Sequence, residues 1–78
     1  MLADQGFQAG QALQVTKSDT VVQPFRALYV GVLGDVTIID LGGNSALFKA
    51  VPAGVYIWCA GTKVMSTGTT ATNIIALN

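Results

Sequence analysis

The chain has 78 residues, of which 51% are hydrophobic and 10% are charged, and its formal net charge is zero. This length leaves room for one domain, and so small a domain is marginally stable unless disulfides, metals or oligomerisation supplement its core. One cysteine and no histidine exclude an internal disulfide and a histidine-based zinc site, so we expect a homo-oligomer without metal or cofactor. Zero net charge provides no attraction toward a phosphate backbone, so nucleic acid is not an expected partner.

The hydrophobic composition does not predict a membrane protein. A spanning helix needs about 20 consecutive apolar residues. The longest uncharged apolar run, residues 50–61, is shorter than that and contains Pro52 and Gly54. Asp4 and Gln5 also break the order of basic and then apolar residues that begins a signal peptide. We therefore expect no membrane partner and synthesis in a cytoplasm.

The first eleven residues differ in character from the rest of the chain. Residues 1–11 contain two glycines, three glutamines and no clear period, so they predict no core element. One interpretation is a disordered terminus. The other is an extended arm that reaches a neighbouring subunit, with Leu2 and Phe7 as its apolar anchors. We accordingly divide the chain into an N-terminal arm, residues 1–11, and a β domain, residues 12–78.

From residue 12 onward, short runs rich in Val, Ile, Leu, Tyr and Thr are separated by Gly, Pro, Asn or Asp. This pattern predicts an all-β domain, a small β-sandwich or barrel of six to eight short antiparallel strands, with no helix longer than one turn. The expected strands are residues 12–16, 20–22, 26–32, 36–40, 46–51, 55–60, 63–67 and 73–77. Eight apolar residues are expected in the core: Leu28, Val30, Val36, Ile38, Phe48, Val55, Ile57 and Ile74.

Glycine, proline and asparagine mark the turns between these strands. Leu33, Gly34 and Asp35 join two apolar runs so closely that they predict a tight hairpin. The sequence Leu-Gly-Gly-Asn at residues 41–44 tolerates the positive φ angles that a hairpin loop requires. The other expected connections are residues 52–54, 60–62 and 68–72.

The strands expected at 46–51 and 55–60 have no polar face. Alternation places Leu47 opposite the core-facing side of the first strand, and places Tyr56 and Trp58 together on one face of the second. In a monomeric two-layer domain, each strand would have one solvated face. We therefore expect the second faces to contact another subunit, with Leu47, Tyr56 and Trp58 as candidate interface residues.

No arrangement of residues predicts catalysis, so we expect a protein that is not an enzyme. Cys59 has no basic residue within three positions, which favours a buried small hydrophobe over a reactive thiol. Asp35 and Asp40 lie on opposite faces of one strand, about 17 Å apart, so we expect Asp35 to cap a turn and Asp40 to end the strand. The glycines of residues 31–34 and 41–44 lack the following helix and lysine of a phosphate-binding loop.

Tyr56 and Trp58 support one alternative function. Two aromatic side chains on one strand face can stack on a sugar, which would suit a small carbohydrate-binding module for host attachment. Subunit interfaces are also enriched in tyrosine and tryptophan. Few polar side chains lie near these two residues in the sequence, so we favour the interface.

Four motifs follow one another along residues 16–78: TKSD at 16–19, RALYVGV at 26–32 with GDV at 34–36, FKAVPAG at 48–54, and TGTTATNIIAL at 67–77. In this order they resemble a family of very short phage and gene-transfer-agent virion proteins, of the head-spike-base or capsid-decoration type. Residues 1–11 and 56–59 depart from the pattern of that family.

The resemblance implies a structural virion protein that decorates or cements the outer surface of a phage capsid, without catalysis or a cofactor. It would be assembled in the host cytoplasm and would contact the major capsid protein. The short core predicts in addition a symmetric homo-oligomer. A trimer is expected because decoration proteins occupy threefold positions of an icosahedral lattice, and a pentamer is the alternative for a spike base at a vertex.

Overall fold

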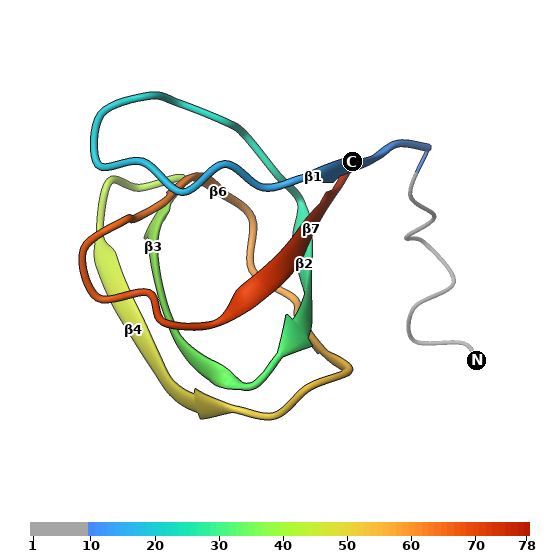
Figure 1. The fold of residues 1–78 in the computed structure, drawn as a ribbon. Helices are drawn as coiled ribbons and strands as arrows, with labels where there is room; N and C mark the ends of the chain where they lie inside the picture. The colour runs from blue at the N-terminus through green and yellow to red at the C-terminus, as the bar shows by residue number, and fades with distance from the viewer. Residues whose placement is uncertain (1–9) are drawn as a thin grey trace.

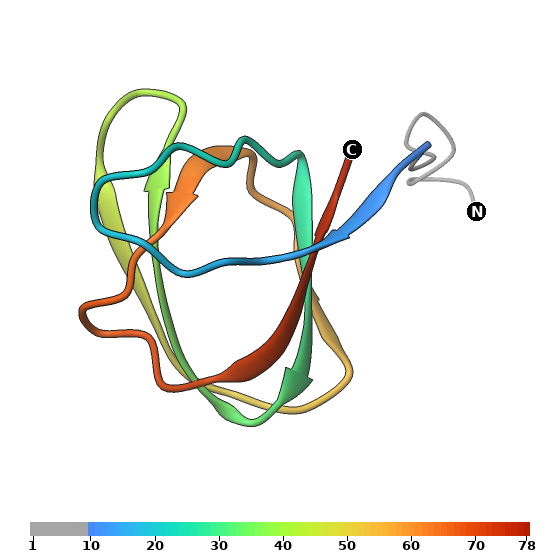
Figure 2. The ribbon, with the colours of Figure 1, turned by 45° about the horizontal axis from the view of Figure 1, so that its top comes forward.

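A computed structural model of the chain describes residues 10–78, which form seven strands in two antiparallel sheets and contain no helix. Sheet A has the strand order β1-β7-β2-β5, and sheet B has the order β4-β3-β6. Figures 1 and 2 show the two sheets curving around one interior. The small all-β sandwich predicted from the sequence is thereby confirmed. The strands are β1 (Ala12–Gln14), β2 (Ala27–Val32), β3 (Gly34–Asp40), β4 (Ser45–Val51), β5 (Val55–Ile57), β6 (Gly61–Val64) and β7 (Thr72–Leu77).

The core lies between the two sheets and is built from alternate residues of each strand. Leu28 and Val30 of β2 and Val36 and Ile38 of β3 are the largest fully buried side chains. They point inward because a strand repeats every two residues. Ile57 and Ile74 are buried as predicted, and Phe48 packs against the core while half-buried. Five further members of the core cluster were not predicted: Phe25, Val51, Val64, Ala71 and Ala76.

The tight hairpin predicted at residues 33–35 is wrong. β2 belongs to sheet A and β3 to sheet B, so the chain crosses between the sheets at Leu33 instead of reversing. Gly34 has no positive φ and begins β3. A Cβ atom at this position would collide with the backbone of Ala71. Glycine is therefore required at this position because two chain segments approach closely. It is not required for an unusual backbone conformation.

Two other expected turns are confirmed. The Asp40 backbone N–H donates to the Asn44 carbonyl at 2.9 Å, which closes the β3–β4 hairpin, and Gly43 has φ +85°. Gly54 has φ +82° in the turn that follows Pro52 and leads from β4 into β5. Both glycines adopt backbone angles that other residues rarely reach.

The strand expected at residues 20–22 is absent. The Ser18 hydroxyl oxygen accepts the backbone N–H groups of Thr20 and Val21 at 3.1 and 2.9 Å, which forms a turn at the start of this segment. A serine that binds the backbone two and three residues ahead competes with strand pairing. Val21 is consequently exposed despite its high β propensity.

One side of the sandwich is closed by the segment that links β1 to β2. The Ser18 N–H donates to the carbonyl of Val64 in β6 at 2.9 Å. Phe25 and Gly61 exchange two backbone hydrogen bonds, of 2.9 and 3.0 Å. Gly61 therefore begins β6, where the sequence predicted a connection over residues 60–62. On this side, backbone hydrogen bonds connect β6 of sheet B to residues 18–25, which lead into β2 of sheet A.

A β-bulge in β4 changes which residues face the core. The register with β3 shifts between Gly34 and Val36, and Ala50 has φ +51°. The Asp35 carboxylate accepts the Ala50 N–H at 2.8 Å and holds the bulge. One extra residue reverses the alternation, so Val51 is buried although strict alternation from Phe48 would place it outside.

Because Ala50 occupies the left-handed region, its Cβ atom is strained. We expect Ala50→Gly to raise the free energy of unfolding by about 0.5–1 kcal/mol. The matched control is Ala53→Gly, since Ala53 is also exposed but has no positive φ, and here added backbone entropy should lower stability. Urea unfolding of both variants checks the prediction. Equal changes in the two variants would contradict it.

Candidate functional site

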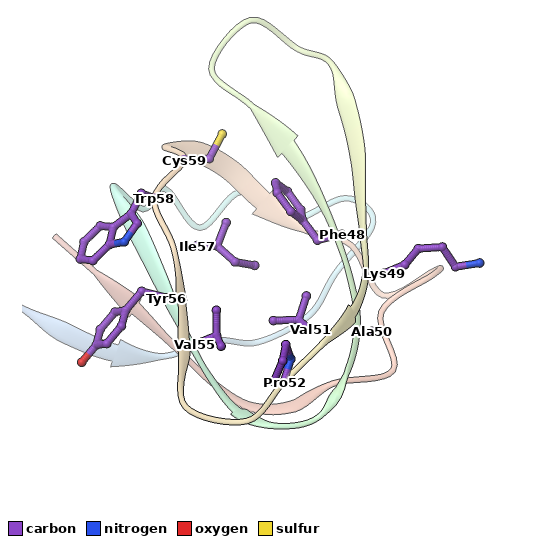
Figure 3. Close-up of a pocket in the computed structure, with 10 residues that line it drawn as sticks. All are labelled: Phe48, Lys49, Ala50, Val51, Pro52, Val55, Tyr56, Ile57, Trp58 and Cys59. Carbon is purple, nitrogen blue, oxygen red and sulfur yellow. The ribbon is translucent and has the colours of Figure 1, made fainter.

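The side of the sandwich opposite the closed one is open. β4 is an edge strand of sheet B and β5 is an edge strand of sheet A, and no ladder joins them among residues 10–78. Between them lies a cavity of about 370 Å³ (Figure 3). We call this opening the β4–β5 seam and define it by its apolar lining: Phe48, Val51, Pro52, Val55, Ile57 and Cys59.

The seam explains one error in the predicted core. Val55 was expected inside, yet it is 38% exposed because β5 has no neighbour on its outer side among the described residues. The sequence signal for the seam was the short connection at residues 52–54, which joins two edge strands that lie in different sheets. That signal becomes meaningful only when the sheet assignment of both strands is known.

Two of the described candidate interface residues, Tyr56 and Trp58, line the cavity of this seam, and Leu47 lies on the edge strand β4 outside that lining. Leu47 on β4 is 52% exposed, Tyr56 on β5 is 46% exposed, and Trp58, just after β5, is 61% exposed. The structure therefore exposes all three side chains and places two of them, Tyr56 and Trp58, at this opening. Leu2 and Phe7 fall outside the described residues.

The two aromatic side chains form a stack. The rings of Tyr56 and Trp58 have centroids 5.2 Å apart and planes inclined by 9°, and Tyr29 meets Tyr56 edge-on at 5.2 Å. Nearly parallel rings at this separation form an offset stack. A flat pair of rings side by side, as sugar stacking would use, is not formed. The stack instead presents a thick apolar ridge beside the seam (Figure 3).

Cys59 is a free thiol at the seam. It is half-buried, packs against the core, and its Sγ lies 3.7 Å from the carbonyl oxygen of Ala60. Lys49 is the charged residue among those that line the cavity. Figure 3 shows the Lys49 side chain pointing away from the opening, so the seam combines an apolar floor with one thiol.

The carboxylates act as backbone acceptors. Asp40 accepts the N–H groups of Gly42 and Asn44, both at 2.9 Å. These hydrogen bonds, that of the Asn44 backbone first, outweigh desolvation and hold the pKa of Asp40 below its ordinary value of 3.8. Asp40 ends β3 as expected and also accepts the N–H groups of the following turn, whereas Asp35, which was expected to cap a turn, holds the β4 bulge.

Asp19 has a structural role that the sequence did not indicate. Its carboxylate accepts the Thr67 hydroxyl at 2.6 Å and the Thr67 N–H at 2.9 Å. The hydroxyl bond is the main cause that lowers the pKa of Asp19. Two loops 48 residues apart in the chain are tied together by this contact. Asp19 and Thr67 both lie in motifs recognised in the sequence, but nothing in the sequence paired them.

Residues 10–78 hold no group of three or more metal-ligating side chains. Over the same residues, no helix has the length and hydropathy needed to span a bilayer.

The fold and the seam define a small two-sheet β protein with an open edge. No protein-family model and no curated protein matches the chain. Among solved structures, the chain is similar to one described as the capsid of a native GTA (gene transfer agent) particle, computed with C5 symmetry. The two share 27% sequence identity with a TM-score of 0.83, over 94% of this chain and 87% of the other.

Proposed function

We propose that the chain is a structural protein of a phage-type or gene-transfer-agent particle, where it decorates or cements the outer surface of the capsid. The observation that carries the proposal is the likeness to a GTA capsid chain across almost the whole length of both proteins. The ordered motifs at 26–36, 48–54 and 67–77 support the same kind of particle independently of the fold.

In this role the chain acts through contacts with further copies of itself and with the major capsid protein. Leu47, Tyr56 and Trp58 form the interface of the β domain, since an apolar ridge beside an open sheet edge is costly to leave in water. Residues 1–11 act as an arm, with Leu2 and Phe7 as anchors. The chain performs no catalysis, and it reaches the capsid surface during assembly in the host cytoplasm.

Density maps of purified particles from cells with and without the gene for this chain test the proposal. We expect difference density on the outer surface of the head, in copies related by a threefold or fivefold axis. Difference density inside the shell or on the tail, or absence of the chain from the particles by mass spectrometry, would contradict it.

The alternative function is a carbohydrate-binding module for host attachment, which the exposed Tyr56 and Trp58 favour. Glycan-array binding that is lost in Trp58→Ala, with particle association unchanged, would support that alternative. The stacked geometry of the two rings favours the structural role instead.

A further inference from the structure

The outer backbone edge of β4 is not paired with another strand among residues 10–78. Asp40 donates to Asn44, so in the β3–β4 ladder every second residue pair from this point is hydrogen-bonded. Ala46 and Phe48 therefore direct their N–H and C=O groups to β3, while Ser45 and Leu47 direct theirs away from it. An edge of this kind is a template for another strand.

The seam also offers pockets for side chains. Phe48 and Val51 of β4 and Val55 and Ile57 of β5 line a cavity of about 370 Å³ and leave space between the two edges. Figure 3 shows these side chains pointing into the opening from both strands. An extended segment laid along β4 would pair its backbone with that strand and bury alternate side chains against this floor.

We propose that the seam binds the N-terminal segment, residues 1–9, of a second copy of the chain. The composition of this segment fits the seam. In an extended conformation Met1, Ala3, Phe7 and Ala9 lie on one side, which is apolar apart from Gln5. Asp4 is the only charged side chain of the segment, and in the same extended conformation it lies on the side opposite Phe7, away from the apolar floor.

The place where the described chain begins also suits exchange between copies. Gly10 and Gln11 bond to the carbonyl of Asn78, at the β1 edge of sheet A. β7 and β2 separate that edge from β5, which puts three strand spacings, about 14 Å, between the start of the domain and its own seam. Nine extended residues span about 30 Å, which is enough to reach a neighbour as well as the chain's own seam, and cross-linking distinguishes these two cases. The inference rests on the proposed function, because reciprocal arms would link decoration subunits to one another.

Cysteine cross-linking tests the inference, since Cys59 is the single cysteine of the chain and lines the seam. The Phe7→Cys variant of the full chain is treated with diamide, which oxidises two thiols to a disulfide and is itself reduced. We expect covalent dimers and larger species on a non-reducing gel, and their loss when Cys59→Ser is added. The matched control is Gln8→Cys, which lies on the opposite side of an extended segment and should cross-link at least about fivefold less.

Four outcomes would overturn the inference. Phe7→Cys could cross-link no better than Gln8→Cys, or its cross-links could persist without Cys59. A disulfide within one chain, seen as a monomer of altered mobility, would show that the segment binds its own seam. A peptide of residues 1–9 added before diamide should lower the dimer yield, and an unchanged yield would count against the seam even if Phe7→Cys altered folding.

The cross-linking and particle experiments fail independently. Cross-linking through Cys59 in a chain absent from particles would leave the strand exchange standing and remove the capsid role. Surface density on the particle without cross-linking would support the capsid role and contradict the strand exchange.

Discussion

Replacing Leu28 with alanine is expected to lower the free energy of unfolding by about 2–5 kcal/mol. Leu28 is 0% exposed, and its strand β2 has a neighbour on both sides, so little of the resulting cavity can collapse. A chain of 78 residues has a total stability of about 4–12 kcal/mol. The substitution therefore removes a large share of the stability, and at the lower bound it unfolds the protein.

Urea unfolding followed by circular dichroism, at one fixed protein concentration, measures this loss. The matched control is Leu41→Ala, because Leu41 lies in the β3–β4 turn and is 70% exposed. Its stability should change by no more than about 0.5 kcal/mol. Similar losses in the two variants would show that Leu28 does not lie in the core.

The purified chain is expected to sediment at micromolar concentration as a symmetric homo-oligomer, a trimer in the first instance, and not as a stable monomer. Apolar burial and conformational entropy nearly cancel in so short a chain without disulfide or metal. Burial of apolar area between copies then makes folding favourable overall. The chain has few charged side chains that would oppose this association. Because association stabilises the fold by mass action, the unfolding midpoint should rise with protein concentration.

Substitution of the aromatic ridge locates the contact. Tyr56→Ser with Trp58→Ser should weaken association at least about 30-fold, since buried aromatic residues carry much of the energy of an interface. Val21→Ser is the control, because Val21 is also exposed but lies in the loop between β1 and β2. A monomer that melts cooperatively, with a midpoint independent of concentration, would refute the prediction. A pentamer would correct the stoichiometry and leave its energetic reason intact.

Short-range sequence patterns predicted the features that depend on neighbouring residues. Period-two alternation placed Leu28 and Val30 in β2, and Val36 and Ile38 in β3, in the core. Glycine and asparagine at residues 41–44 predicted the hairpin that Asp40 and Asn44 close. In both cases the backbone geometry of a few consecutive residues is sufficient to determine the outcome.

The same reasoning failed where distant segments meet. Gly34 looks like a turn residue, but the backbone of Ala71 is what requires glycine there. Val51 faces inward because of a bulge in β4 at Ala50. The carboxylate of Asp35, on the neighbouring strand β3, holds that bulge. Neither contact can be predicted from the residues that are adjacent in the sequence.

From the sequence alone, composition and alternation determined an all-β chain and named Leu47, Tyr56 and Trp58 as candidate interface residues, and all three side chains are exposed in the structure. Only the tertiary structure decided that Tyr56 and Trp58 lie at one opening between β4 and β5. The physical reason is that alternation specifies the face of a strand but not the sheet to which it belongs. Hydrogen bonds close one side of the sandwich through Ser18, Phe25 and Gly61, and the crossover at residues 52–54 leaves β4 and β5 as unpaired edges on the other.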